Sequence, residues 1–390
     1  MHRMRHAHEA RGLALGQKVD VGRQSAHRRE ISTLHPRNPL IGLIPACSRM
    51  VSSRGTPMSA AFEIQSPLPG AAFGATVRLA RPLSQEIPDG LAAVLAKANG
   101  LLLIQGLTEI ADRPQLLVDI SLKFGPEVED YRHTLSRASS VHTTAPEIFL
   151  VSNMAPVNRA PPRRPDPPVT ADGRLPVQYP HRKGWHTDQS YRRPPPDISL
   201  FYAVTPVARN RGQTLFADGT AAYAALPAHL KAKVDGLQGL HCQPGTARSR
   251  EGALAGRTDI EQASTARSQP QPVVRTHPVT GKPALYLCEW GQMDWVDGPF
   301  VGMEPGPRGE GAALLDELMA HYTRPEFVYV HEWTVGDLIV WDNRCLVHAA
   351  TWYDGDTEQR MMWRTTVRGN PGAIYEGEAR SWMPREQVPA

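Results

Sequence analysis

The sequence predicts a mostly β fold, a barrel or a pair of facing sheets with flanking helices, built around a metal site. Two segments far apart in the chain support this prediction, because each places metal-binding side chains on or beside a predicted strand. His186 and Asp188 are two residues apart, so on a strand both point to one side while Thr187 points away. The run 337–341 reads as a buried strand that leads to His348.

The elements around these two segments follow from the hydrophobic pattern and from helix-ending residues. In chain order the pattern predicts a strand over 73–79, an amphipathic helix over 84–99, a buried strand over 101–105, a helix over 113–123, a helix over 310–321 and a strand over 327–333. We expect the helices and strands at the start of this series to buttress the barrel.

Two long segments are expected to be irregular. Residues 156–180 are rich in proline with arginine interleaved, which excludes a regular helix or a central strand. Because this stretch runs directly into His186, we expect a loop over the mouth of the site, with a surface excursion as the alternative. Residues 243–272 also lack a pattern. Long structureless loops inside compact domains are often lids, although some are simply mobile.

His186, Asp188 and His348 are the candidate metal ligands and catalytic residues. With 15 His and 19 Asp in 390 residues, roughly 0.7 His-x-Asp pairs arise by chance, so the pair needs structural context. Taken singly, either histidine is better explained as a core or surface residue. Two imidazole nitrogens and one carboxylate oxygen, however, occupy one face of an octahedral metal and leave three positions open. This is the ligand set of non-haem Fe(II) oxygenases.

Two arginines downstream of His348 favour the joint interpretation. Arg360 and Arg364 lie four residues apart in a run rich in Met, Thr and Val. Strand geometry places both on one face, roughly 13 Å apart, and so on the wall of one cavity. A guanidinium group can hold a carboxylate through two parallel hydrogen bonds, which suits the distal carboxylate of 2-oxoglutarate. The alternative is a solvated strand edge or an ion pair.

Five motifs, in order along roughly residues 70 to 370, resemble the taurine and chlorophenoxyacetate dioxygenases that depend on Fe(II) and 2-oxoglutarate. They are His186-Thr187-Asp188, then Gly212-Gln213-Thr214 with residues 221–227, then residues 274–278, then residues 336–344 leading to His348, and finally Arg360 with Arg364.

The resemblance implies a double-stranded β-helix, which is a cupin-like jelly-roll barrel. It implies that His186, Asp188 and His348 bind Fe(II) and that Arg360 and Thr214 bind 2-oxoglutarate. Arg364 would contact either 2-oxoglutarate or an anionic substrate. With O2, such an enzyme hydroxylates a small anionic organic substrate and releases succinate and CO2; the substrate is an alkylsulfonate such as taurine, an aryloxyalkanoate or another organic acid.

Two further expectations concern residues near the site. The polar side chains of residues 342–344 are expected to brace the turn that presents His348, because hydrogen bonds of this kind fix the orientation of a metal ligand. His277, in a turn of its own, is expected to be structural.

Two other classes of function compete with the oxygenase. A zinc hydrolase or lyase could use the same three ligands, but it would not need Arg360 and Thr214 beside them to hold a dicarboxylic acid. A non-catalytic barrel that binds small acids would keep the cavity and lose a ligand. All three ligands are present, so the oxygenase is favoured.

The basic character of the chain belongs to its N-terminal tail. Residues 1–58 hold 10 Lys and Arg against 3 Asp and Glu, which leaves 33 against 36 in the rest. The remainder therefore gives no argument for nucleic-acid binding. We expect residues 1–58 to be a disordered basic extension or a gene start placed too far upstream; a transit peptide is only faintly suggested. Residues 59–390 are expected to form a single catalytic dioxygenase domain.

Other global features agree with a cytoplasmic enzyme. No stretch approaches roughly 18 uninterrupted apolar residues, so no membrane span is expected. Cys47, Cys242, Cys288 and Cys345 lack paired or metal-type spacing, as expected of reduced thiols. A homo-oligomer is compatible with the sequence, which does not decide the point.

Overall fold

The computed structural model describes residues 61–134, 138–162, 184–244, 248–256, 268–289 and 291–369. The chain separates into residues Met1–Pro57 and Met58–Ala390, and all described elements belong to the second unit. The expectations for residues 1–58 and for Cys47 lie outside the described residues.

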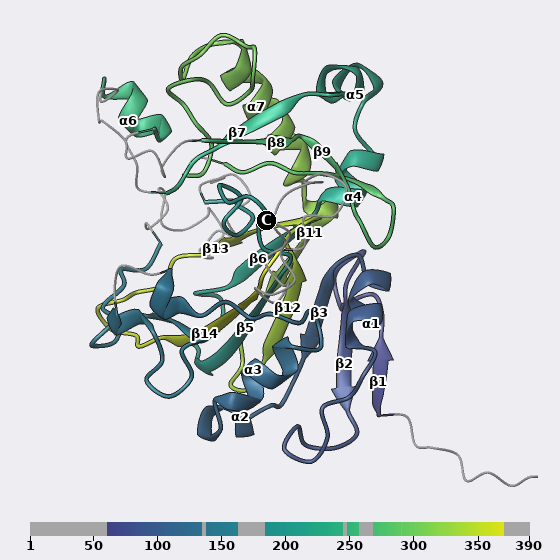
Figure 1. Cartoon of the computed structure of the whole chain (residues 1–390), viewed down its shortest axis with the longest axis vertical. Helices are drawn as coiled ribbons and strands as arrows, with labels where there is room; N and C mark the ends of the chain where they lie inside the picture. The colour runs from purple at the N-terminus through teal and green to yellow at the C-terminus, as the bar shows by residue number, and fades with distance from the viewer. Residues whose placement is uncertain are drawn as a thin grey trace, which may run out of the picture. The chain divides into compact units, whose positions relative to one another are not determined.

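The largest sheet in the described part of the chain has seven strands in the order β1-β2-β3-β12-β5-β14-β4. The strands from β1 to β14 in this order are labelled in Figure 1. Neighbouring strands are antiparallel, except that β2 and β3 are parallel. The strands of this sheet are β1 Phe62–Gln65, β2 Ala75–Leu79, β3 Leu101–Ile104, β4 Phe149–Ser152, β5 Ile198–Thr205, β12 Leu338–Asp342 and β14 Met361–Val367.

A smaller antiparallel sheet and two strand pairs complete the described β structure. The smaller sheet has the order β11-β6-β13, and the pairs are β7 with β8 and β9 with β10. These strands are β6 Thr214–Asp218, β7 Gln238–His241, β8 Gln269–Pro272, β9 Val274–Thr276, β10 Pro283–Leu285, β11 Val328–His331 and β13 Leu346–Ala350.

The larger and smaller sheets face each other across a common core, as the alternation of side chains along the strands shows. In β12, Ile339 and Trp341 belong to the same buried cluster as Phe216 of the smaller sheet. Leu338 and Val340 belong to a different cluster on the opposite side of the sheet. Successive residues of a strand point to opposite faces, so β12 is buried on both sides.

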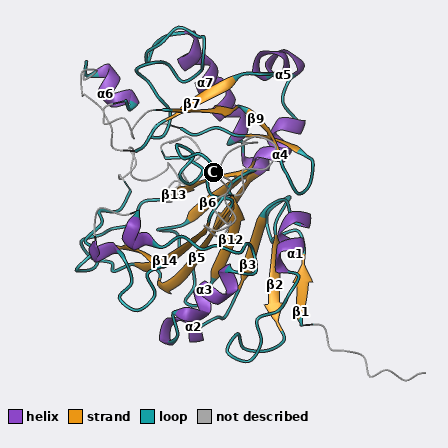
Figure 2. Cartoon of the chain, in the orientation of Figure 1, coloured by secondary structure: helices purple, strands orange, loops and turns teal. Residues whose placement is uncertain are grey.

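Helices cover the outer face of each sheet (Figure 2). Apolar residues of α1, α2 and α3 pack in the cluster on the outer face of the larger sheet. Apolar residues of α4, α5 and α7 pack against the smaller sheet. The helices are α1 Leu91–Lys97, α2 Glu109–Asp112, α3 Gln115–Ser121, α4 Gly219–Ala224, α5 Ala228–Val234, α6 Arg250–Leu254 and α7 Glu310–Tyr322, with 3-10 turns η1 Tyr131–His133, η2 Ala138–Ser140 and η4 Pro325–Phe327.

The sheet-rich fold with flanking helices agrees with the sequence prediction, and several predicted elements appear within a few residues of their expected ends. The helix predicted over 84–99 is wrong in its first half, since α1 begins only at Leu91. Pro88 lacks an amide donor, and Gly90 has φ 89°, a left-handed conformation that a helix interior cannot contain. The segment 243–272, expected to be irregular, includes α6 and β8 in its described part.

Among the described residues, no helix combines the length and the apolar composition that a membrane crossing requires.

Candidate metal centre

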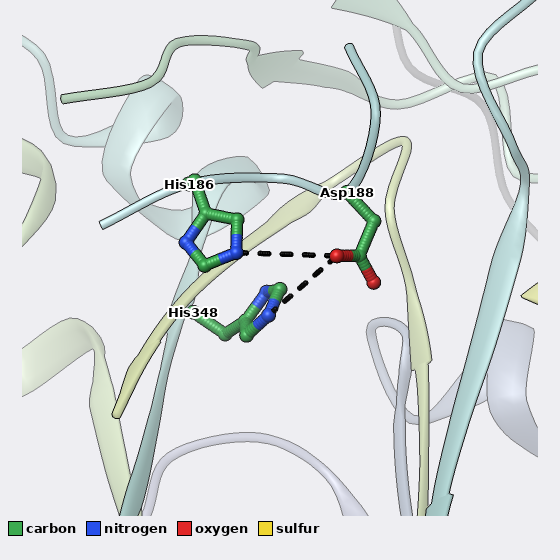
Figure 3. Close-up of side chains that lie close together, drawn as sticks. All are labelled: His186, Asp188 and His348. Carbon is green, nitrogen blue, oxygen red and sulfur yellow. Dashed lines mark ion pairs between the residues drawn. The ribbon is translucent and has the colours of Figure 1, made fainter. Parts of the chain in front are cut away.

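His186, Asp188 and His348 come together in the structure, although 160 residues of sequence separate the last two. Nε2 of His186 lies 3.9 Å from Oδ1 of Asp188, and Nε2 of His348 lies 4.0 Å from the same oxygen (Figure 3). The three potential ligand atoms lie within 4.8 Å of one another. One metal ion placed between them could therefore be bound by all three.

The backbone fixes the two histidines against each other. The His186 amide donates to the His348 carbonyl at 2.9 Å, and the His348 amide donates to the His186 carbonyl at 2.8 Å. His348 is part of β13, whereas His186 makes only this isolated bridge. Of the two placements that the sequence allowed, on a strand or at the end of one, His186 and Asp188 do not share a regular strand, because the chain turns at Asp188 and Gln189 has φ 49°.

The hydrogen-bond partners favour the metal-binding forms of the ligands. Nδ1 of His186 lies 2.7 Å from the Gly184 carbonyl, which can only accept, so the ring proton is on Nδ1 and the lone pair is on Nε2. Burial lowers the pKa of His186 and, together with the charge of His186, lowers the pKa of His348 to about 3. Both rings are therefore neutral at pH 7, as metal ligation requires.

Asp188 remains ionised in spite of its burial. Burial by itself raises the pKa of a carboxyl group, but Arg364, followed by His348 and His186, holds the pKa of Asp188 well below its ordinary value. Nη1 of Arg364 donates to Oδ1 at 2.8 Å, and the Ser199 hydroxyl donates to Oδ2 at 2.7 Å. The carboxylate is thus oriented from both sides.

Asn343 connects this carboxylate to the turn between β12 and β13. Its Oδ1 accepts hydrogen bonds from the amide of Asp188 at 3.2 Å and from Nε1 of Trp341 at 2.9 Å. Its Nδ2 donates to the Ser199 hydroxyl at 2.9 Å, and its carbonyl accepts from Thr187 Oγ1 at 2.8 Å. The expectation that residues 342–344 brace the turn before His348 agrees with these contacts.

A second group of potential ligands, His277, Asp342 and Cys345, also lies within 4.8 Å. Nδ1 of His277 accepts from two backbone amides of the turn that follows it, at 3.2 and 3.1 Å. The ring proton is therefore on Nε2, which donates to Asp342 at 2.9 Å and has no lone pair for a metal. Arg344 already pairs with Asp342 at 2.6 Å. This group is a hydrogen-bonded support, in agreement with the structural role expected for His277.

A cavity of about 110 Å³ adjoins the first group of ligands. Its described lining contains Val151, Arg159, His186, Phe201, Thr214, Trp341, His348, Ala350, Arg360 and Arg364.

Thr214, the first residue of β6, is a wall residue of this cavity. Its Oγ1 accepts from Trp333 Nε1 at 3.0 Å, which leaves the hydroxyl proton for another partner. Gly212 lies two residues earlier with φ 60°, and a Cβ there would lie 2.4 Å from Val207 and 3.6 Å from Nε of Arg360. Glycine suits this position because of its positive φ and its close approach to Val207.

Arg360 presents unpaired donors in a buried position. Arg360 is only 5% exposed, and its Nε and Nη2 atoms have no hydrogen-bond partner among the described residues. Burial lowers its pKa to about 10, so the group is still charged at pH 7. Its neighbours are the rings of Phe201 and Tyr353, whose centroids lie 5.6 and 5.7 Å from Cζ. A buried guanidinium with free donors requires an anion, and a carboxylate of a bound acid fits this requirement.

Arg364 differs from Arg360 although both line the cavity. From the resemblance we expected the anionic group of the primary substrate, rather than a protein carboxylate, as its partner, whereas the structure pairs Arg364 with Asp188. Its Cζ also lies 5.0 Å from the ring centroid of Phe149. The expected strand spacing between the two arginines is altered, because Arg360 precedes β14 and the pairing register shifts between Met361 and Met362.

The sequence did not single out Arg159 or Ser199. Arg159 lies in the described part of the proline-rich segment and lines the cavity. Most of the segment, residues 163–180, lies outside the described residues, so the loop expected over the site mouth stays a prediction. Nothing in the sequence distinguishes Arg159 from the other arginines of that segment. Ser199 is one of several small residues on a buried strand, and only its contact with Asp188 reveals its role.

Two neutral imidazoles and one carboxylate match the ligand set of non-haem iron enzymes, and a guanidinium with free donors lines the adjoining cavity. The chain belongs to the taurine catabolism dioxygenase TauD, TfdA family, whose model matches residues 64–366. Members of this family use Fe(II), 2-oxoglutarate and O2.

Individual relatives agree with this assignment. The chain is 37% identical over 185 residues to the alpha-ketoglutarate-dependent 2,4-dichlorophenoxyacetate dioxygenase of Cupriavidus pinatubonensis. The matched segment covers 47% of this chain and 59% of the relative. It is 26% identical to a taurine dioxygenase from Burkholderia xenovorans, with a TM-score of 0.55 over 80% of this chain and 92% of that one. The structure of AAD-2 in complex with Mn(II) and N-oxalylglycine gives a TM-score of 0.56 at 26% identity, over 79% and 97%.

The matched segment thus spans about three fifths of the length of the curated relative.

Proposed function

We propose that this protein is an Fe(II)- and 2-oxoglutarate-dependent dioxygenase that hydroxylates a small anionic organic substrate and releases succinate and CO2. The observation that carries the proposal is a buried guanidinium with unpaired donors, Arg360, on the wall of the same cavity as His186 and His348. A metal site alone would suit many reactions. The added anion site is what a 2-oxoglutarate enzyme needs.

Different residues of the chain would bind the iron and the 2-oxoglutarate. His186, Asp188 and His348 would hold the iron by one face, which leaves three positions for the co-substrate and dioxygen. Arg360 and the Thr214 hydroxyl would hold the distal carboxylate of 2-oxoglutarate. When bound, iron and 2-oxoglutarate supply the oxidising chemistry, and the protein supplies placement and exclusion of side reactions.

The facing sheets support a double-stranded β-helix as the fold, with the iron ligands at its open interior. His348 lies on β13 of the smaller sheet, and Trp341, which also lines the cavity, lies on β12 of the larger sheet. A cavity between two sheets of this kind is the usual place for a ligand in a jelly roll. The described cysteines, Cys242, Cys288 and Cys345, are buried free thiols, which is compatible with a cytoplasmic enzyme.

The anionic nature of the substrate has support from the charges of the cavity. Three arginines line it, and its described lining contains no carboxylate. The relatives are named for 2,4-dichlorophenoxyacetate, a carboxylate, and for taurine, a sulfonate. A zinc hydrolase or lyase is the less favoured alternative, since it gives no role to the free donors of Arg360.

Succinate release tests the proposal. The full chain is incubated in air with Fe(II), 2-oxoglutarate and, in turn, 2,4-dichlorophenoxyacetate, taurine and an alkyl sulfate, with Zn(II) replacing Fe(II) as the control. We expect succinate that requires Fe(II) and increases with at least one acid. The result that would contradict the proposal has two parts: no acid gives Fe(II)-dependent succinate, and one of the acids is hydrolysed when Zn(II) is present. That result would assign the site to the hydrolase class.

A further inference from the structure

Arg159 lies in the wall shared by the metal-site cavity and a larger outer pocket. The inner cavity of about 110 Å³ includes His186, His348 and Arg360. The outer pocket, about 560 Å³, is lined by Asn153, residues 158–161, Trp352 and residues 354–356. Arg159 is the residue that the two linings have in common. It is also exposed, so a molecule entering from solvent can reach it.

The loop that carries Arg159 is held in place by contacts with the segment that carries Arg360. The Arg159 amide donates to the carbonyl of Ser152, the last residue of β4, at 2.8 Å. The side chain of Asn153 donates to the Glu358 carbonyl at 2.8 Å and accepts from the Arg360 amide at 2.8 Å. The two arginines are therefore presented by one connected backbone unit, which favours a defined binding geometry.

Among the described residues, no carboxylate pairs with the Arg159 side chain, although Asp354 and Asp356 line the outer pocket with it. No hydrogen bond or ion pair joins its side chain to another described residue. Arg364 is paired with Asp188 at 2.8 Å, and Arg360 is assigned to 2-oxoglutarate. Because Fe(II) and the 2-oxoglutarate dianion cancel each other, and Asp188 offsets Arg364, the positive charges of Arg360 and Arg159 remain, and of these two only Arg159 is not already assigned to 2-oxoglutarate.

The pKa values of Arg159 and Arg360 show that nearby arginine charges act on both groups. Burial, and to a smaller extent the charge of Arg159, lowers the pKa of Arg360. Although the residue is exposed as a whole, the protein atoms around its guanidinium displace water and lower the pKa of Arg159, and the charge of Arg364 lowers it further. Guanidinium groups that disfavour each other's charge in this way are relieved by a bound anion.

We propose that Arg159, rather than Arg364, receives the anionic group of the primary substrate at the boundary between the inner cavity and the outer pocket. The group is a carboxylate, sulfonate or sulfate, and the residue determines specificity by holding that anion while the carbon to be oxidised lies toward His186 and His348. This inference rests on the proposed function and goes beyond it by assigning the substrate's charge to a residue.

The experiment compares the full-length wild type with Arg159→Gln, Arg159→Lys and the control Arg209→Gln. Arg209 is an exposed arginine that lines neither pocket. Succinate is measured with Fe(II) while the concentration of 2,4-dichlorophenoxyacetate, taurine or hexyl sulfate is varied, and then while 2-oxoglutarate is varied. The melting temperature of each variant shows that it is folded.

We expect Arg159→Gln to raise the KM for the active acid roughly 10- to 100-fold, as loss of a charge-assisted contact does. The KM for 2-oxoglutarate should change less than about twofold, since that acid depends on Arg360. Arg159→Lys should recover part of the loss because it keeps the charge, and Arg209→Gln should match the wild type.

Three results would overturn the assignment. If Arg159→Gln leaves the KM for the acid unchanged in an active enzyme, the inference alone is wrong and the anion belongs elsewhere, with Arg364 the next residue to test. If the KM for 2-oxoglutarate rises as much as that for the acid, Arg159 serves the co-substrate instead. If the wild type forms no succinate with any of the three acids, the proposed function fails, and this inference fails with it.

Discussion

Arg360 and Arg364 show that the hydrogen-bond partners of a side chain determine its role in the site. They are four residues apart and line one cavity, yet Nη1 of Arg364 is paired with Asp188 and its Nε has no partner, whereas Nε and Nη2 of Arg360 both lack a partner among the described residues. A paired guanidinium orients the metal ligand, and an unpaired buried one requires an anion. Their separate roles follow from this difference and could not follow from spacing alone.

At the residue scale, replacement of His348 by alanine tests the metal site. We expect His348→Ala to abolish Fe(II)-dependent succinate formation, because two ligands cannot replace three in an open catalytic site. The melting temperature of the metal-free protein should stay close to that of the wild type, as thermal unfolding followed by circular dichroism would show. His229→Ala is the matched control, since the His229 side chain is 67% exposed. Normal activity in His348→Ala would remove this residue from the site.

The same site gives a second prediction for Arg360. In Arg360→Lys the charge is kept but the planar pair of donors is lost, so the free energy of binding 2-oxoglutarate should weaken by about 1 to 3 kcal/mol. This corresponds to a roughly 5- to 150-fold higher KM for 2-oxoglutarate, measured by succinate release at saturating primary substrate. Arg209→Lys serves as the control. An unchanged KM would place the anchor on another arginine.

At the scale of elements, the turn between β12 and β13 contacts the segments of the candidate metal ligands through Asn343. This residue is completely buried and joins Asp188, Ser199 and Trp341, and the His348 backbone follows five residues later. One side chain thus connects the first ligand segment, a strand of the larger sheet and the strand that carries the third ligand.

Asn343→Ala should therefore weaken both the fold and the metal site. The buried donors of Asp188 and Trp341 would lose their acceptor, which costs about 1 to 3 kcal/mol for a buried unsatisfied group. Loss of a contact that orients a ligand should also reduce metal affinity by roughly 10- to 100-fold. Urea unfolding and a Mn(II) titration measure the two effects, with the exposed Gln115→Ala as the control. Unaltered Mn(II) affinity would mean that Asn343 serves the fold alone.

The elements that the sequence predicted well are those whose pattern depends on burial. The apolar run that forms β3 and the periodic apolar residues of α7 are buried as predicted. In both elements the apolar side chains seen in the sequence form the face that packs in the core. The region before Leu91 was misread, since Pro88 and Gly90 prevent a helix despite nearby apolar residues. The ligand segment at His186 was expected on a strand or at the end of one, and it forms a single bridge to His348 that is followed by a turn.

At the scale of the whole molecule, the order of motifs along the chain was enough to predict the candidate metal ligands. It was not enough to predict which charged side chains pair with them. His186, Asp188 and His348 could be selected because their residue types match one metal geometry. The Asp188 pairing of Arg364 and the cavity position of Arg159 depend on distances between segments that no local pattern specifies. Residues 59–390 as a single catalytic domain stay a prediction.

The N-terminal tail provides a prediction at this scale. The compact unit that contains the site begins at Met58, and residues 1–57 contribute no patterned apolar segment. A chain that starts at Met58 should therefore have the melting temperature and the Fe(II)-dependent succinate rate of the full chain. The comparison is made at equal metal loading. A reproducibly lower melting temperature would show that the tail contributes to the stability of the second unit.

The central claim is that one site binds a metal and a 2-oxoglutarate-like acid together. Calorimetric titration of N-oxalylglycine into the full-length protein tests this claim without any knowledge of the primary substrate, with Mn(II) present or absent. We predict binding of about one equivalent that requires Mn(II), disappears in His348→Ala and weakens in Arg360→Lys. Binding that is equally strong without metal, or that survives in His348→Ala, would contradict the account.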